Sequence, residues 1–427
     1  MFSKCIGFAI AMALSGAAAQ AQTDPCTDSP AQAELVPLAQ AMQFSLEADL
    51  RPELATAEVR AARTARAIAA LRPADTVSLE VEDFPGTGLA SEVKNLQVTG
   101  SFSRVWERGG KREAREALAR RGVEVAEIRL AAAEFEIREE VETLYAEAAL
   151  AEGRLALACD QIERSRELEA VIQRRVDAAR DPLLAGARAT SDRLRAEAEA
   201  RRYAAQAANL RAALGAYWLA KDDFRLDPDF LQARLAPRAF DIADISSPDL
   251  DRLAKEQLQS AAQVELERAE AVPDVTWSVG VRKFGLEEDA AVVAGASIPL
   301  GSGGRSDAAV ARARADQLRL ETERDTIRQD LIRRAASYHR TALSALEHIK
   351  EIDTVLLSAA NEGVTLARDG YARGAFSYLD IISAQSAVDE LREERLSHLR
   401  TYILNDAALA RLAPEAGTSA PSPETQP

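Results

Sequence analysis

The amino-acid sequence predicts a mainly α-helical protein with a small β part, arranged as two tandem repeats of a β-hairpin followed by a pair of long coiled-coil helices. Three observations predict this fold. Proline is absent from residues 86 to 181 and from 300 to 413. Aromatic residues make up only 5% of the chain and charged residues 28%, which suits long, surface-rich helices better than one globular core. Similar segments also recur in the two halves.

Each proline-free stretch predicts a long helix, because a proline inside a helix costs about 3 kcal/mol. The first is expected from about residue 112 to 180, where apolar residues recur mostly at alternating steps of four and three, the pattern of a coiled coil. Roughly 70 residues at 1.5 Å each give a rod of about 105 Å, which is too long for a compact domain. An earlier helix is expected from about residue 30 to 72.

Alternating polar and apolar residues predict four strands, one pair before each long helix. They cover residues 76–82, 96–103, 275–281 and 290–298. Taken alone, the pattern would also fit a half-buried sheet in a soluble sandwich. The internal repeat instead makes strands and rods parts of one unit.

The repeat is visible in two alignments of the chain with itself. Residues 103–111 align with 297–305 at an offset of 194. Gly109 and Gly110 therefore correspond to Gly303 and Gly304, and both pairs are predicted to form strand-to-helix turns, where glycine tolerates unusual backbone angles. At a second offset, of 188, three more pairs align: Gly186 with Gly374, Asp192 with Asp380, and Ala196 with Ala384. The two repeats are expected at 22–225 and 226–412.

Both ends of the chain lie outside these repeats. Residues 1–21 predict a signal peptide, with Lys4 as the only charge, an apolar run from Cys5 to Leu14, and the small-x-small sequence at 19–21. The apolar run is short for a membrane anchor, and no cysteine follows it directly to carry a lipid. Residues 413–427, rich in Pro, Ser, Thr and Gly, are expected to be disordered.

No later apolar run approaches the roughly 20 residues of a membrane-spanning helix. If the mature chain crosses a membrane, it must therefore do so as β-strands in a closed barrel, because lipid does not tolerate unpaired backbone groups. Four strands cannot close a barrel. An oligomer is required, and the strand count allows eight strands from two chains or twelve from three.

Several functional classes are disfavoured. A net charge of −15 argues against a nucleic-acid partner. The histidines, His339, His348 and His398, lack metal-ligand spacing, and the glycine-rich turns lack the spacing of a phosphate-binding loop. We therefore expect no catalytic residue, no metal site and no cofactor, and a protein that is not an enzyme.

Four segments carry a resemblance to a known family: residues 79–88, 109–112, 296–300 and 374–385. In their order and spacing, the sequence resembles the TolC-like outer-membrane efflux proteins of Gram-negative bacteria, and more closely their CzcC/CusC-type heavy-metal branch, over about residues 31 to 412. The resemblance implies a homotrimer with a twelve-stranded barrel in outer-membrane lipid and a periplasmic α-helical tunnel.

The resemblance also implies partners and a cargo. The partners would be a periplasmic adaptor protein and an inner-membrane resistance-nodulation-division transporter. Heavy-metal cations are the favoured cargo, while drugs or secreted proteins stay open. A soluble periplasmic coiled-coil adaptor or scaffold is a further alternative, which the duplicated hairpins disfavour.

In this family the reversals between long helices form the channel entrance, here about residues 181–191 and 369–377. Candidate gate residues follow by matching positions in this sequence: Asp380, Asp192, Ser191, Tyr371 and Ser383. Asp380 matches a pore-narrowing aspartate, Ser383 stands where a second one is found, and Phe376 replaces an arginine. The carboxylates of three copies around a narrow axis would attract cations. Alternatively, Asp192 and Asp380 only cap their return helices.

After signal-peptide cleavage, Cys26 and Cys159 are the remaining cysteines. Cys26 lies just before the first helix, which climbs about 65 Å to the strands. Cys159 lies about 73 Å down the long helix that descends from Gly110 at the strands. Both cysteines are therefore at a similar distance from the strands. This predicts a disulfide between them in an oxidising compartment. The alternative is a free Cys159 thiol on the apolar stripe.

Overall fold

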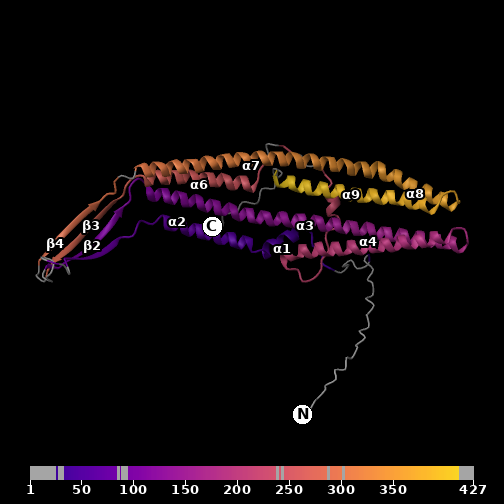
Figure 1. Cartoon of the computed structure of the whole chain (residues 1–427), viewed down its shortest axis with the longest axis horizontal. Helices are drawn as coiled ribbons and strands as arrows, with labels where there is room; N and C mark the ends of the chain where they lie inside the picture. The colour runs from indigo at the N-terminus through magenta and orange to yellow at the C-terminus, as the bar shows by residue number, and fades with distance from the viewer. Residues whose placement is uncertain are drawn as a thin grey trace, which may run out of the picture.

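The computed structural model describes Cys26 and residues 33–83, 87, 95–236, 240–241, 245–285, 289–300 and 303–412 of the 427-residue chain. The expected signal peptide (1–21) and tail (413–427) lie outside these residues. The described helices form an elongated body with one sheet at its end (Figure 1). The elements are α1 (Leu38–Ala48), α2 (Arg51–Ala69), β1 (Thr76–Glu82), β2 (Gln97–Trp106), α3 (Lys111–Asp177), α4 (Leu183–Gly215), η3 (Ala216–Trp218), α5 (Phe230–Ala233), α6 (Pro248–Glu270), β3 (Val275–Phe284), β4 (Ala290–Ser297), α7 (Gly303–Glu351), η5 (Ile352–Leu356), α8 (Leu357–Ala372) and α9 (Tyr378–Leu412).

The four predicted strands are confirmed as one antiparallel sheet in the order β1-β2-β3-β4. The two hairpins join through β2 and β3, whose pairing runs from Gln97 opposite Phe284 to Trp106 opposite Val275. This shared ladder explains why both strands run three residues beyond their predicted ends. The hairpins of the two repeats thus form a single sheet.

The first long helix is also confirmed. α3 has 67 residues and is therefore about 100 Å long. It begins after Gly109 and Gly110, whose φ angles of +73° and +74° are left-handed and favour glycine. A Cβ on Gly109 would lie 2.7 Å from Val272, so this turn also needs close backbone packing. At its other end Pro182 disfavours helical geometry at Asp181, which helps end the helix before it.

The second strand-to-helix connection differs from the first. α7 begins at Gly303, so Gly303 and Gly304 are helical residues, and neither has a left-handed φ. The prediction that they form a turn like Gly109 and Gly110 is wrong, because the two repeats are not identical here. α7 then continues through the π-helical segment η5 into α8.

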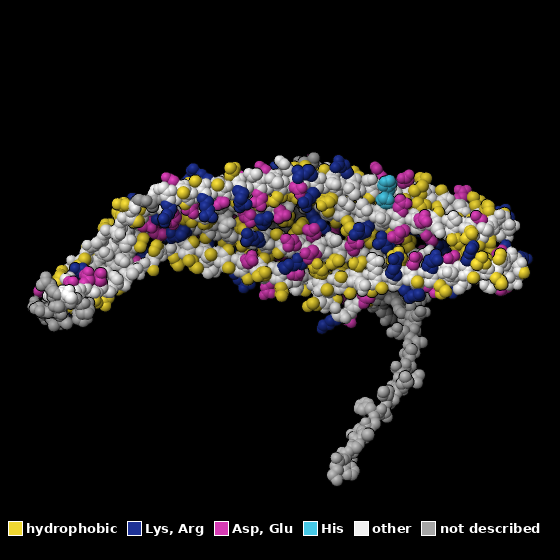
Figure 2. Space-filling view, in the orientation of Figure 1, with side chains coloured by type: hydrophobic (Ala, Val, Ile, Leu, Met, Phe, Trp, Pro, Cys, Tyr) yellow, Lys and Arg dark blue, Asp and Glu magenta, His cyan; other side chains and the backbone are white. Residues whose placement is uncertain are grey.

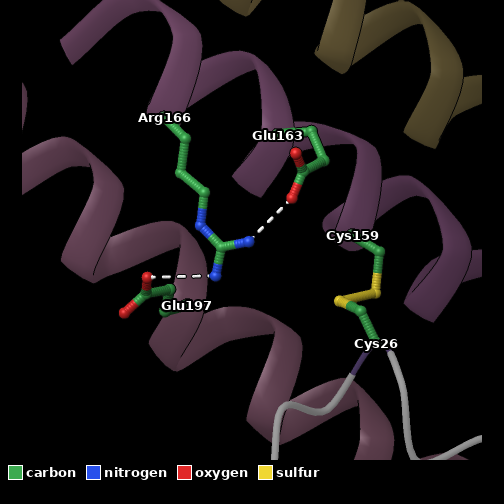
Figure 3. The surroundings of a disulfide bond; sticks show 5 residues. All are labelled: Cys26, Cys159, Glu163, Arg166 and Glu197. Atoms are coloured by element: carbon green, nitrogen blue, oxygen red, sulfur yellow. Dashed lines mark hydrogen bonds and ion pairs between the residues drawn. A yellow bond between two sulfur atoms is a disulfide. The ribbon is translucent and has the colours of Figure 1, made fainter. Parts of the chain in front are cut away.

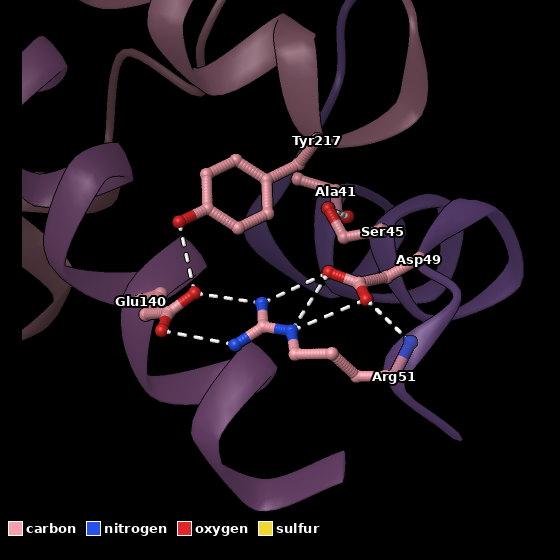
Figure 4. Close-up of polar contacts among 6 residues, drawn as sticks. All are labelled: Ala41, Ser45, Asp49, Arg51, Glu140 and Tyr217. Atoms are coloured by element: carbon pink, nitrogen blue, oxygen red, sulfur yellow. Dashed lines mark hydrogen bonds and ion pairs between the residues drawn. The ribbon is translucent and has the colours of Figure 1, made fainter. Parts of the chain in front are cut away.

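The expected helix from 30 to 72 is interrupted. α1 ends at Ala48 and α2 begins at Arg51, because Pro52 in the first turn of α2 has no N–H to donate and cannot continue α1. Asp49 accepts a hydrogen bond from the Arg51 backbone at 2.8 Å. The Arg51 guanidinium joins Asp49 to Glu140 of α3 (2.9 and 2.8 Å), which fastens the break to the long helix (Figure 4).

α3 runs along most of the body. It packs against α2 and α6 in the half nearer the sheet and against α4 and α9 in the other half, and α7 packs on α6 and α9 (Figure 1). No helix within the described ranges is both long and apolar enough to span a membrane.

The main hydrophobic core lies where α1, α3, α4, α7 and α9 meet. Fully buried Tyr145 of α3 donates a hydrogen bond to the Val36 carbonyl (3.0 Å) and accepts one from the Asp227 amide (2.8 Å). A short parallel bridge pairs Leu35 with Arg225 beside it. These contacts attach the chain segments at the two ends of the first repeat to the rod.

Candidate functional site

Two helical reversals lie together at the end of the body opposite the sheet, which we call the tip (Figure 1). They are residues 178–182, between α3 and α4, and 373–377, between α8 and α9. Both are shorter than the predicted reversals of 181–191 and 369–377. The offset of 188 would place the first at 185–189, so this turn comes seven residues earlier than the repeat predicts. Gly186 is consequently buried inside α4.

Tyr371 connects α8 to the first reversal. Its hydroxyl donates a hydrogen bond to Asp181, whose carboxylate also binds Arg175 of α3 at 2.9 Å. The Arg175 guanidinium lies over the Tyr371 ring, 4.4 Å from its centre. The Arg175 hydrogen bond lowers the pKa of Asp181. Burial and the hydrogen bond to Asp181 raise the pKa of Tyr371 to about 12.

Tyr378 connects α9 to α4 in a similar way. Its buried ring directs the hydroxyl to Asp192, 2.7 Å away. Burial, with the hydrogen bond to Asp192, raises the pKa of Tyr378. Asp192 lies well inside α4, which begins at Leu183, so the alternative that it caps this helix is wrong. We refer to Tyr371–Asp181 and Tyr378–Asp192 as the tip pairs.

Asp380 does cap its helix. The Ser377 backbone N–H and hydroxyl both donate to its Oδ2, at 2.7 and 2.8 Å, as in a capping box. These bonds lower the pKa of the exposed Asp380 carboxyl, the backbone one most. Ser191 and Ser383 are exposed. Phe376 packs on Gly370, where an added Cβ would lie 2.0 Å from its ring.

Sequence reasoning missed Asp181, Arg175 and Tyr378. A signal for Tyr378 was present, because the chain has only 7 tyrosines and two of them fall within eight residues at one reversal. The partners of the tyrosines carried no such signal.

Polar contacts also join α3 to α9 in the half of the body away from the sheet. Arg154 binds Glu393 at 2.8 Å, Arg164 binds Asp389 at 2.5 Å, and Arg400 binds Glu147. Burial raises the pKa of Asp389 despite the nearby Arg164. α3 and α4 meet through small and apolar side chains, Ala158, Ile162, Ala196 and Ala200, and through ion pairs such as Arg193 with Glu169 at 2.6 Å. The contacts of α3 with α9 and with α4 therefore both combine apolar packing with ion pairs.

The disulfide between Cys26 and Cys159 is present, with the two Cα atoms 5.7 Å apart (Figure 3). Cys26 packs against the apolar cluster between α3 and α4. About two turns along α3 from Cys159, Arg166 binds Glu163 of its own helix (2.7 Å) and Glu197 of α4 (3.6 Å). The bond thus holds Cys26 to α3 of the rod.

The sheet has two chemically different faces. The register places Val, Leu and Phe side chains on one face, and these are between 38% and 80% exposed: Val77, Leu79, Val81, Phe102, Val279, Val281 and Val292. Trp106 and Trp277 lie on the same face near the helices. On the other face Ser78 bonds Ser101 (2.7 Å) and Arg282 bonds Thr99 (2.9 Å).

Comparison with known proteins places the chain in a family. A sequence profile of the outer membrane efflux protein family matches residues 240–413. The chain is 30% identical over 329 residues to the nickel-cobalt-cadmium resistance protein NccC of Alcaligenes xylosoxydans xylosoxydans, covering 75% of this chain and 72% of NccC. It is 31% identical over 316 residues to the nickel and cobalt resistance protein CnrC of Cupriavidus metallidurans, covering 71% and 75%. The chain belongs to the outer membrane efflux protein family.

The solved structures agree on the fold. The crystal structure of CusC, reported in a study of its folding and transmembrane channel formation, superposes with a TM-score of 0.73 at 16% identity. The match covers 88% of this chain and 91% of CusC. The prediction of a mainly α-helical, TolC-like fold is confirmed.

The tip pairs give a first prediction. The double variant Tyr371→Phe with Tyr378→Phe removes two hydrogen bonds to carboxylates, each contributing about 1.5–3 kcal/mol at most. We expect faster amide hydrogen exchange in residues 370–382, measured by mass spectrometry. Tyr338→Phe is the matched control, because this hydroxyl has no hydrogen-bond partner among the described residues. Unchanged exchange in the double variant would show that the pairs do not hold the hairpins.

The raised pKa of Tyr371 gives a second prediction. An ordinary tyrosine has a pKa near 10. Because the folded pKa is higher, at about 12, the stabilisation from the Tyr371 phenol is complete below pH 10 and is lost as the pH rises through 12. An absorbance titration should lose one late-titrating tyrosine in Tyr371→Phe. Asp181→Asn should shift that titration to lower pH, and an unchanged curve in both variants would contradict the assignment.

Proposed function

We propose that this protein is the outer-membrane exit duct of a tripartite efflux system, in which three copies close their sheets into a twelve-stranded barrel and their rods into a periplasmic tunnel. The observation that carries this proposal is the two-faced sheet. An exposed apolar face opposite a polar face is the pattern of a barrel with lipid outside and water inside.

The sheet edges support an oligomer. β1 and β4 are each paired on one side only. Unpaired strand edges are not tolerated in lipid, so β1 of one copy would pair with β4 of the next. Trp106 and Trp277, 61% and 53% exposed, lie where a barrel places its aromatic girdle at the membrane interface.

The rod edges fit the same arrangement. On one edge, Leu54 and Ile68 of α2, with Leu71 just after it, are 64–65% exposed. On the other edge, α7 exposes Leu318 by 63%, on a shallow stretch of surface that also includes Ala315 and Ile327. In a cyclic trimer one edge of each copy meets the opposite edge of the next, so both apolar surfaces would be covered.

The tip is the proposed docking surface for a periplasmic adaptor, which would link the duct to an inner-membrane resistance-nodulation-division transporter. Four exposed apolar side chains lie in or directly after the two reversals, between 49% and 83% exposed: Leu183, Leu184, Phe376 and Leu379. Exposed apolar side chains gathered at one end of a protein mark a site for a protein partner. The gate candidates Asp192, Asp380, Tyr371, Ser191 and Ser383 lie at or near this surface.

We infer heavy-metal cations as the cargo, because NccC and CnrC are named for resistance to nickel, cobalt and cadmium. A strain lacking this chain should lose tolerance to one or more of these metals and keep its tolerance to drugs. The reverse result would favour a drug duct of the same fold.

Cell fractionation tests the duct itself. We expect a mature chain that begins near residue 22 and migrates as a heat-resistant trimer in the outer-membrane fraction. A monomer in the periplasmic fraction would instead support a coiled-coil scaffold.

A further inference from the structure

Two of the chain's three histidines meet on the surface of the rod. Figure 2 shows histidine atoms (cyan) as one patch in the half away from the sheet. His348 of α7 and His398 of α9 stack with ring centres 4.9 Å apart and planes 24° from parallel. Their side chains are 54% and 27% exposed, so an ion in solution can reach both rings.

Each ring has a glutamate beside one of its nitrogens. His348 Nδ1 lies 3.8 Å from Glu351, and His398 Nε2 lies 3.6 Å from Glu394. The nitrogens on the other side of each ring are His348 Nε2 and His398 Nδ1. In protein metal sites a ligating imidazole almost always donates its second N–H to a carboxylate or carbonyl, which orients the ring and makes it a stronger ligand.

We propose that His348 and His398 bind a divalent transition-metal cation, of the Ni²⁺, Co²⁺ or Zn²⁺ class, through His348 Nε2 and His398 Nδ1. Imidazole suits these cations, whereas Mg²⁺ and Ca²⁺ prefer oxygen ligands. Water completes the coordination, because no cluster of three or more His, Cys, Asp or Glu in the described part of the chain is arranged to hold a metal. The site is therefore weak and exchangeable.

Binding needs only a small rearrangement. Metal–nitrogen distances are about 2.0–2.1 Å, so the two ligating nitrogens can be at most about 4.2 Å apart. The ring centres are now 4.9 Å apart, and the rings must turn so that both nitrogens face one ion. Because both side chains are partly exposed, we expect rotation about their side-chain bonds to supply this rearrangement. The glutamates at 3.8 and 3.6 Å then lie close enough to accept the remaining N–H of each ring after a small shift.

The metal would cross-link α7 to α9 at an irregular part of the rod. His348 lies four residues before η5, and Arg395 of α9 already binds Asp353 of η5 at 2.6 Å. π-helical segments are rare and often mark functional positions. Because the ion binds only the folded arrangement, it should raise thermal stability.

The test is Ni²⁺ titration of the purified, untagged full-length chain by calorimetry. We expect saturable binding of one ion per chain, lost in His348→Gln and in His398→Gln. His339→Gln is the matched control and should bind as the unaltered chain does, because His339 contacts Phe240 at a separate place. Glu394→Gln should weaken binding about tenfold or more. Equal binding by the unaltered chain and the double histidine variant, or no saturable binding at all, would overturn the proposal.

A melting experiment provides a second readout. Ni²⁺ should raise the melting temperature of the unaltered chain and leave that of the double histidine variant unchanged, while Ca²⁺ affects neither. Equal shifts in both proteins would also overturn the site. This proposal goes beyond the proposed duct, since a chain that conducts nothing could still bind the metal, and a working duct could lack the site.

Discussion

Removing the Cys26–Cys159 disulfide is expected to lower the free energy of unfolding by about 3–5 kcal/mol. The two cysteines are 133 residues apart in sequence. A cross-link over so long a loop restricts the unfolded chain strongly, because the entropy of loop closure grows with loop length. The bond also keeps Cys26 packed on the cluster that contains Ala158 and Ile162.

The double variant Cys26→Ser with Cys159→Ser tests this expectation. Its denaturation midpoint should fall to that of the reduced unaltered chain, measured by circular dichroism under matched conditions. Adding reductant to the double variant is the control and should change nothing, because no disulfide remains to be reduced. Equal midpoints for the oxidised chain and the double variant would mean that the bond contributes no stability.

The second large effect is expected from Val279→Arg. Val279 lies on β3 in the apolar face and is 53% exposed in the single chain. An arginine facing lipid near the middle of a bilayer costs about 2–4 kcal/mol, and each of three copies would carry one. We therefore expect little trimer in the outer-membrane fraction.

Ser278→Arg is the matched control for this variant. Ser278 is the preceding residue and points to the opposite face, where it pairs with Ser103 and Gly295. The same arginine there should permit membrane assembly and reduce the cation preference of the pore. If Ser278→Arg blocked assembly and Val279→Arg did not, the two faces would be assigned the wrong way round.

Much of the fold could be predicted because its signals are local. Strand alternation located β1–β4, and the missing prolines located α3 and the α7–α8 rod. The interruption between α1 and α2 was also readable, since Pro52 falls in the first turn of α2. The prediction of one continuous helix from 30 to 72 gave this proline too little weight.

The tip could be predicted only in part. Tyr371 pairs with Asp181 across 190 residues, and Tyr378 with Asp192 across 186. Periodicity within one helix does not indicate which residue of another helix pair lies opposite a given side chain. The first reversal also comes seven residues earlier than the repeat predicts. The disulfide was accessible to sequence reasoning because only two cysteines remained, and helix rise placed them at a similar depth.

Single-channel recording of the purified mature protein in a planar bilayer tests the duct most directly. We expect cation-selective pores whose conductance rises in the Tyr371→Phe and Tyr378→Phe double variant and changes in Asp380→Ala. A protein that stays monomeric in solution and gives no conductance would contradict the proposed channel.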